Sequence, residues 1–337
     1  MKVWMRNTAV KIIGLLIGLI LLGVSFVMSI RFGFTKISWG TMQAALLHYD
    51  ESSMDQVVVR TARLPRALIA AAIGASLAIA GVIMQAVTRN PLASPSVLGV
   101  NAGASFTIVL FITVYGWSDM RALVWISFAG AGLAAATVYV LGSMSREGLS
   151  PLRVILAGSA MIALFMSGTQ GLLVFNQNGL QDVMFWLAGS IASRDLDMLL
   201  TVLPYLGVGW IAAYGLSGHL NLMALGEETA RGLGQRTVLI QWIAGVIVVL
   251  LAGGSVAVAG PIGLIGIIIP HMARYMAGQD HRWLIPYCAV YGAVLLLLAD
   301  VAARFIILPE EVPVGIMTAA IGAPFFIYLA RKEMKRK

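Results

Sequence analysis

The sequence predicts an all-α membrane protein with about ten transmembrane helices. Of its 337 residues, 59% are hydrophobic and only 11% are charged, whereas roughly 25% of residues are charged in a typical soluble domain. So little charge cannot cover a surface that faces water, and lipid must therefore be the solvent for most of the chain. Because no hydrophilic domain interrupts the apolar stretches, we expect a single membrane domain over residues 1–337.

The candidate spans follow from the requirement for about 20 mainly apolar residues per spanning helix. In order, they are Ile12–Ile30, Ala67–Val87, Val97–Tyr115, Ala122–Leu141, Val154–Val174, Asp197–Tyr214, Val238–Val258, Gly263–Ala277, Leu284–Val301 and Gly315–Leu329. The eighth is short and contains Pro270. The first follows basic residues as a secretory signal does, but it is long enough to span a bilayer, and no small-x-small cleavage site precedes Arg31. We expect it to be retained as a helix.

The distribution of lysine and arginine predicts the orientation, since short loops rich in these residues stay in the cytoplasm. With both termini inside, the inner segments hold Lys2, Arg6, Lys11, Arg89, Arg146, Arg153, Arg231, Arg236, Arg274, Arg282, Arg331, Lys332, Lys335, Arg336 and Lys337. The outer segments hold Arg31, Lys36, Arg60, Arg63, Arg66, Arg121, Arg194 and Arg304. We therefore predict a multi-pass protein with both termini cytoplasmic and a basic tail near anionic lipid headgroups. No nucleic-acid partner is expected, because the charges flank apolar spans and form no continuous basic face.

Small residues recur at helical spacing on the second span. Gly74, Ala78, Gly81 and Gln85 share one helix face. Small residues let helix backbones approach closely, and a polar side chain can form a hydrogen bond across such a contact. The pattern predicts either tight packing alone or a translocation path between helices.

The segment Arg89–Pro95 carries Pro91 and Pro95, a spacing that breaks any helix. A broken polar segment at membrane depth must be shielded by protein or line a water-filled cavity. Two interpretations remain open at this point, a rigid inner turn and part of a cytoplasmic gate.

The longest inner loop runs over residues 217–234. Its pattern predicts a turn at Ser217–Asn221, then a short helix with Glu227, Glu228 and Arg231 at helical spacing, and then a stop at glycines. A short amphipathic helix of this kind could dock a cytosolic partner. A solvated surface helix is the alternative.

Glycines and prolines in Gly260–Gly266 and at Pro270 predict a short or interrupted helix, which often marks a transport path. No metal site is expected, because the four histidines are scattered and Cys288 is the only cysteine. Near the outer end of the ninth span, Asp300 and Arg304 lie one helical turn apart and can pair. Such a pair is either structural or functional.

The chain carries no nucleotide-binding loop and no catalytic constellation. A P-loop requires Gly-Lys-Ser/Thr, and none of the six lysines follows a glycine. No nucleophile–base pair is found in the spans, so an enzyme is not expected. If ATP drives transport, another subunit must bind it. A secondary transporter driven by ions remains the rival of a different class, although such proteins usually carry acidic residues within the spans.

Taken in order, these segments resemble the FecCD family of ABC importer permeases, which serve iron–siderophores, haem and cobalamin. The resemblance covers nearly the whole chain. The motifs are Arg63-Leu64-Pro65-Arg66, Gly81 to Gln85, Arg89-Asn90-Pro91-Leu92-Ala93 with Pro95, Leu98-Gly99, Leu156-Ala157-Gly158, the loop from Gly218 to Gly234, Gly260-Pro261-Ile262-Gly263 with Pro270-His271, Asp300, Arg304, Glu311-Val312-Pro313-Val314-Gly315 and Gly322-Ala323-Pro324.

The resemblance implies the type II ABC importer permease fold, with ten transmembrane helices in the bacterial cytoplasmic membrane. It implies a second permease subunit, identical or homologous, two ATPase subunits on the inner face, and an extracytoplasmic substrate-binding protein. It implies no cofactor on this chain and ATP used by the ATPase subunits. The expected ligand is of the iron(III)–siderophore type, with cobalamin or haem as alternatives.

The resemblance also implies roles for individual residues. Arginines that pair with glutamates of the binding protein resemble Arg63, Arg66 and Arg304. The cytoplasmic gate resembles Asn90 and Leu92, and a second gate segment resembles Ser150, which here is followed by Pro151. The helix that couples to the ATPase resembles the loop segment containing Leu222, Ala224, Leu225, Gly226, Glu227, Glu228 and Arg231.

Overall fold

Helices make up nearly all of the regular structure in the computed structural model, which describes residues 7–33, 35–117, 119–144, 151–175, 180–192, 194–307 and 310–334. The helices are α1 (Thr8–Arg31), α2 (Trp39–Leu47), α3 (Met54–Val58), α4 (Leu64–Thr88), α5 (Val100–Tyr115), α6 (Met120–Ser143), α7 (Pro151–Phe175), α8 (Leu180–Leu187), α9 (Leu196–Ala224), α10 (Glu227–Gly232), α11 (Thr237–Val248), α12 (Gly254–Ala259), α13 (Ile265–Ala277), α14 (His281–Ala303) and α15 (Val314–Met334). Two π-helical segments, η1 (Val59–Arg63) and η2 (Val249–Gly253), continue into α4 and α12.

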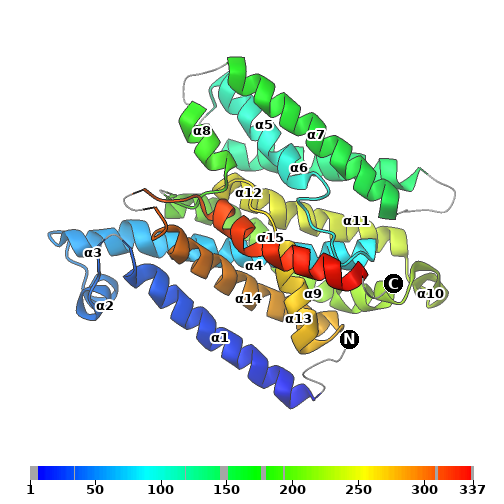
Figure 1. Cartoon of the computed structure of the whole chain (residues 1–337), viewed down its shortest axis with the longest axis horizontal. Coiled ribbons are helices and arrows are strands. Elements are labelled where there is room, and N and C mark those ends of the chain that lie inside the picture. Colours follow the sequence, from blue (N-terminus) through cyan, green and yellow to red (C-terminus); the bar gives the residue numbers. More distant parts are fainter. Residues whose placement is uncertain are drawn as a thin grey trace.

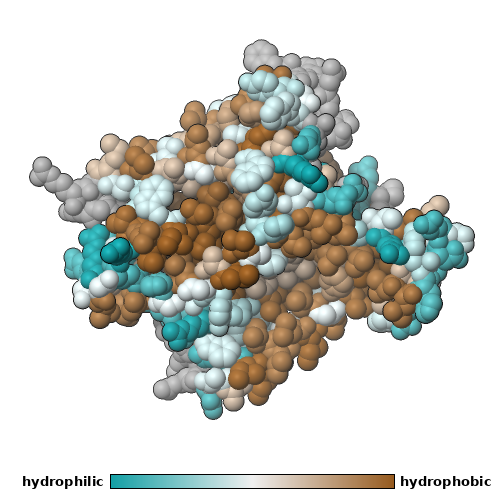
Figure 2. Space-filling view, turned by 180° about the vertical axis from the view of Figure 1, so that it is seen from behind, coloured by the Kyte–Doolittle hydropathy of each residue, from teal (hydrophilic) through white to brown (hydrophobic). Residues whose placement is uncertain are grey.

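The predicted all-α membrane fold is confirmed. Each of the ten predicted apolar segments coincides with a helix or with a continuous helical run. Within the described residues, seven runs are long and apolar enough to cross a membrane, and α5 and α15 are shorter apolar helices. Hydrophobic side chains cover much of the middle of the surface, while hydrophilic ones gather toward two opposite ends (Figure 2).

Helix α4 lies in the middle of the bundle (Figure 1). In its most apolar 18-residue window 83% of the residues are buried, against 22% in the window of α1 at the edge. Glycine allows the close packing, since a Cβ on Gly81 would lie 2.1 Å from the carbonyl oxygen of Gly266 in α13. On the same face the Gln85 amide donates to Gly266 O at 3.0 Å. The predicted close contact with a hydrogen bond across it is therefore confirmed.

The two ends of the bundle carry different elements. α2 and α3 lie at one end, and α10 lies at the other (Figure 1). The first turn of α1 and the last described turn of α15 lie toward the α10 end in the same view. We call the end that contains Arg63, Arg66, Asp300, Arg304 and Glu311 the arginine end.

The π-helical segment η2 has a side-chain partner of its own. A π turn widens the helix and leaves a backbone carbonyl without its usual partner, and such turns occur often at functional sites. Ser127 of α6 donates its hydroxyl to Gly253 O at 2.8 Å. This bond fixes α6 against the middle of the run from α11 to α12.

The expected turn at Ser217–Asn221 is wrong, because α9 continues without a break to Ala224. Leu216, Ser217 and Leu220 are buried against neighbouring helices, and this burial outweighs the low helix propensity of Gly218. The chain turns later, at Gly226, whose φ of 113° requires glycine.

Candidate functional site

Arg63 sits at the junction of η1 and α4 and points into the protein. Its side chain is 7% exposed. Its Nη1 donates to the carbonyl oxygens of Ile30 and Arg31, both at 2.9 Å, and its Nη2 donates to Thr35 O and Oγ1 at 2.5 and 2.9 Å. The last carbonyls of a helix lack partners within the helix and attract cations. Arg63 therefore anchors the end of α1 to the start of α4.

Asp300 is the centre of a buried ionic cluster at the same end. The carboxylate is fully buried and accepts from Arg66 Nε and Nη2 at 2.9 and 2.8 Å, as well as from Arg304, the C-cap residue of α14. Arg66 also pairs with Glu311 at 2.6 Å. The predicted pairing of Asp300 with Arg304 is confirmed, and Arg66 joins it from α4.

Arg304 extends this cluster to α1. Its Nη1 donates to the carbonyl oxygens of Ser29 and Phe32 at 2.7 and 2.8 Å, and the residue is 3% exposed. Arg63 and Arg304 thus bind the same last turn of α1 from two different helices. Most of their donors are engaged inside the chain.

A cavity of about 550 Å³ opens among these arginines. Its lining includes Arg63, Arg66 and Arg304, together with Arg194 and Glu311. The Nε atoms of Arg194 and Arg304 are buried and have no hydrogen-bond partner among the described residues. The arrangement brings four guanidinium groups to one hollow, which suits a carboxylate from outside the chain.

Sequence reasoning counted Arg194 among the outer cations but gave it no role. It lies in the connection between α8 and α9, more than 100 residues from its neighbours Arg63 and Arg66 in the cavity. Burial lowers the pKa of its guanidinium, although nearby Asp195 acts in the opposite direction. The only signal in the sequence for its place in this cavity was that Arg194 belongs to a predicted outer segment, as Arg63, Arg66 and Arg304 do.

Two other outer cations lie at the surface, Arg60 exposed and Arg31 half-buried. Arg60, the third arginine of the triplet before the second span, lies 4.4 Å from the centre of the Tyr49 ring. Arg31 lies 5.3 Å from the centre of the Trp39 ring. These two cation–π contacts hold positive charge at the surface beside the cavity.

At the opposite end, the predicted coupling segment divides into three parts. Leu222 and Ala224 belong to the last turn of α9, Leu225 and Gly226 form the linker, and Glu227, Glu228 and Arg231 lie on α10. Glu227 accepts from Arg231 at 2.6 Å and lies 4.0 Å from Arg89 at the end of α4. Helix α10 thus reaches the start of the predicted gate segment.

The predicted gate segment is a non-helical stretch between α4 and α5. Arg89 ends α4 in the left-handed conformation with φ of 51°, and Asn90 Oδ1 accepts from the backbone N–H of Leu92 at 3.0 Å. The predicted break in the helix is confirmed. The hydrogen bond from Leu92 to the Asn90 side chain stabilises the first turn of the non-helical stretch. Ser150 lies outside the described residues.

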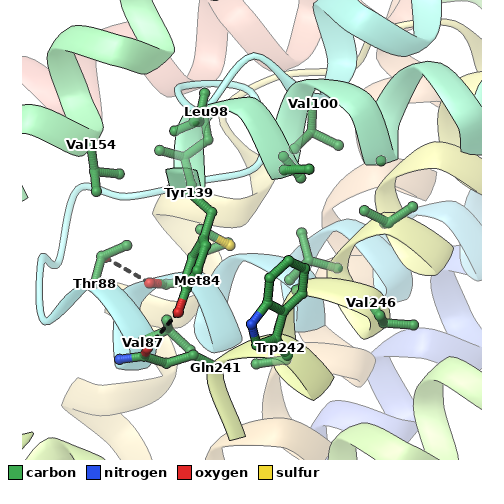
Figure 3. Close-up of a pocket in the computed structure, with 18 of the residues that line it drawn as sticks. Met84, Val87, Thr88, Leu98, Val100, Tyr139, Val154, Gln241, Trp242 and Val246 are labelled. Carbon is green, nitrogen blue, oxygen red and sulfur yellow. Dashed lines mark hydrogen bonds between the residues drawn. The ribbon is translucent and has the colours of Figure 1, made fainter. Parts of the chain in front are cut away.

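A second cavity, of about 320 Å³, lies beside the gate segment. Figure 3 shows Tyr139 and Trp242 lining it, with a hydrogen bond from the Tyr139 hydroxyl to Gln241 Oε1 at 3.2 Å. Most of its lining is apolar, including Met84, Leu98 and Val246. It therefore offers few polar groups to a charged ligand.

Known proteins are similar to this chain over nearly its whole length. The model of the FecCD transport family matches residues 20–332. The chain is 50% identical over 307 residues to the "Probable siderophore transport system permease protein YfiZ" of Bacillus subtilis strain 168, covering 91% of this chain and 92% of that protein. It is 41% identical to the iron(3+)-hydroxamate import system permease FhuB of the same strain, covering 98% and 86%.

A relative in another organism and a solved structure are also similar to most of this chain. The ferric enterobactin transport system permease FepD of Escherichia coli K12 is 41% identical, with 84% of each chain covered. A solved structure described as an inward-facing conformation of a metal-chelate type ABC transporter matches with a TM-score of 0.82 and 32% identity, covering 94% of this chain and 98% of that one.

Proposed function

The chain belongs to the FecCD transport family, and from this premise we propose that it imports an iron(III)–siderophore-type ligand as the permease of an ABC importer. It is a multi-pass membrane permease and a transport component, not an enzyme. The 50% identity to a siderophore permease over 91% of the chain is the observation that carries the ligand class. Cobalamin and haem are the alternative ligands.

Power for transport comes from partner subunits in this proposal. The chain has no P-loop lysine, so two ATPase subunits bind ATP beneath the α10 end, and a second permease, identical or homologous, completes the pathway. The α10 end then faces the cytoplasm together with both termini, which agrees with the lysine and arginine bias. A purified complex with two permease and two ATPase chains supports this assembly, and a permease that transports alone contradicts it.

We assign docking of the substrate-binding protein to the arginine cavity. Arg63, Arg66, Arg304 and Arg194 line it, and acidic side chains of the binding protein would enter it. Charge attraction speeds such docking and weakens with salt. Because Arg63 and Arg304 also hold α1, their substitution removes internal bonds together with the docking contact. Arg194 allows the cleaner test.

The docking test is Arg194→Glu in the assembled complex. We expect the affinity for the binding protein to fall about tenfold, since a like charge replaces an attractive one. The matched control is Arg121→Glu, at an exposed outer position outside the cavity, for which we expect a change below about twofold. Equal affinities of the two variants would remove the cavity from the docking surface.

The ligand class is tested by uptake in vesicles that hold permease, ATPase and binding protein. We expect ATP-dependent uptake of radioactive iron as a siderophore chelate, with little competition from cobalamin or haem. The rival secondary transporter predicts uptake that collapses with the proton gradient while ATP remains high. Asp300 argues against that rival, because the one fully buried carboxylate among the described residues is bound to two arginines.

A further inference from the structure

One amide side chain joins the predicted coupling segment to a different part of the chain. Asn221, in the last turns of α9, donates its Nδ2 to Asp280 Oδ1 at 2.7 Å. Its Oδ1 accepts from the backbone N–H of His281 at 2.8 Å and lies 2.7 Å from the Nδ1 of the same residue. Asn221 therefore holds the turn between α13 and α14 by three contacts.

The turn between α13 and α14 is also stabilised by hydrogen bonds within it. Asp280 is the N-cap of α14 and accepts from the backbone N–H of Arg282 at 3.0 Å, and His281 is 3% exposed. Burial raises the pKa of Asp280. The hydrogen bonds from Asn221 and Arg282 together lower it by more than burial raises it, so the net pKa lies below the usual value. The carboxylate is thus ionised at neutral pH and accepts from both partners.

From this turn a second amide leads to the gate segment. α13 ends three residues before Asp280, and its Arg274 donates Nη1 to Gln85 Oε1 at 2.5 Å. Gln85 also binds Gly266 O near the start of α13. It therefore holds both ends of α13 against α4, four residues before Arg89. The contacts form a continuous path from α9 through α13 to the end of α4.

We propose that Asn221 is a positioning residue that transmits movement of the coupling segment to the α13–α14 turn and, through α13 and Gln85, to the gate segment 89–99. The inference rests on the proposed function, in which the ATPase moves α10. Asn221 touches no cargo; it makes the coupling segment and the turn move as one unit. A contiguous network of this kind needs a demonstrated coupling between its members.

The alternative link from α10 to the gate is weaker. Arg89 and Glu227 are 4.0 Å apart, and the Arg89 side chain is 44% exposed. Glu227 already accepts from Arg231 at the shorter distance of 2.6 Å. Exposed pairs of this geometry contribute little, so this pair alone would allow α10 to move without the gate segment.

The test exchanges the two partners. Asn221→Asp replaces the hydrogen bond to Asp280 by two facing carboxylates, and their repulsion loosens α9 from the turn although a carboxylate at position 221 can still accept from His281. Asp280→Asn keeps a side-chain oxygen that can accept at the helix cap, and it serves as the matched control. In the double variant N221D/D280N the bond is restored with donor and acceptor reversed, while position 280 can still accept from the Arg282 N–H. A merely structural role predicts the same rescue, so the measurement that separates the two roles is the movement of α10 relative to the turn.

Spin labels report the coupling without any cargo. Cysteines introduced at the exposed positions Thr229, on α10 but outside the predicted coupling residues, and Gln279 carry the labels in the permease–ATPase complex. Native Cys288 is fully buried and does not react. On addition of ATP we expect the distance between the labels to stay constant in the parent protein and in N221D/D280N. It should change in Asn221→Asp, in which α10 moves without the turn. A constant distance in Asn221→Asp overturns the proposal.

Transport provides the second measurement. We expect Asn221→Asp to lower chelate imported per ATP hydrolysed at least about fivefold, and the double variant to return within about twofold of the parent. If Asn221→Asp does not assemble, Asn221→Ala removes the contacts without a charge and should give the same loss. Loss without rescue in a folded double variant overturns the inference. Failure of the parent complex to import any chelate counts against the proposed ligand instead, and the label distances still decide the role of Asn221.

Discussion

The two ends of this bundle are held by different kinds of bond. At the arginine end, two guanidinium groups and two carboxylates form an ionic cluster around buried Asp300, and Arg63 and Arg304 bind the last turn of α1. At the α10 end, amide side chains join the helices, as Asn221 and Gln85 show. The first arrangement is costly to break, because removing one partner leaves an unpaired buried charge. The second consists of single hydrogen bonds to charged groups, which contribute about 1.5–3 kcal/mol each.

The difference suggests which end rearranges during transport. A conformational change needs contacts whose rearrangement costs little relative to the driving reaction. At the α10 end the amide of Asn221 keeps the coupling segment and the α13–α14 turn together while both shift, whereas the cluster around Asp300 keeps its geometry as the chain moves. We therefore expect the arginine end to act as a rigid frame for docking and the α10 end to carry the motion.

The largest expected effect is that of Asp300→Asn at the arginine end. This change leaves Arg66 and Arg304 without their common carboxylate in a buried site, and we expect a loss of about 3–5 kcal/mol in the free energy of unfolding. The measurement is thermal unfolding in detergent with a thiol-reactive dye, since the only cysteine, Cys288, is fully buried until the protein unfolds.

The control for this variant is Glu311→Gln. Glu311 pairs with Arg66 at 2.6 Å but its side chain is 24% exposed, so water replaces part of the lost interaction. We expect a loss of about 1 kcal/mol or less. If Asp300→Asn were as mild as this control, the ionic cluster would not be the rigid frame described above.

An intermediate effect is expected for Gln85→Leu on the opposite half of α4. The substitution leaves Gly266 O and Arg274 without their amide partner, and an unsatisfied buried group costs about 1–3 kcal/mol. The same dye assay should place this variant between Asp300→Asn and the parent protein. A loss as large as that of Asp300→Asn would erase the distinction between the two ends.

Local patterns in the sequence predicted much of this structure. Length and hydropathy predicted the spans, and the spacing of Gly81 and Gln85 predicted a close helix contact, since each depends on residues within one helix. The fold identifies α13 as the partner in that contact. Asp300 and Arg304 were predicted to pair because they lie one turn apart. The proline-containing break after Arg89 followed from backbone chemistry alone.

The contacts made between distant segments could not be read in the same way. The distribution of lysine and arginine predicted that Arg63 lies on the outer side of the membrane. Only the fold shows that it binds the end of α1. Asn221 was expected in a turn over Ser217–Asn221, but burial of that part of α9 keeps it helical instead. Its partners Asp280 and His281 are about 60 residues away, where no periodicity connects them.

The smallest expected effect on stability is that of Glu227→Gln on α10. The carboxylate pairs with Arg231, whose side chain is 58% exposed, and lies farther from Arg89. Exposed pairs one turn apart contribute about 0.3–0.5 kcal/mol, and the new amide can still accept from Arg231. We therefore expect an unfolding temperature nearly equal to that of the parent protein in the dye assay. A decrease as large as that of Glu311→Gln would mean that this exposed pair holds α10 more firmly than its geometry indicates, and the α10 end would then share the ionic character of the arginine end.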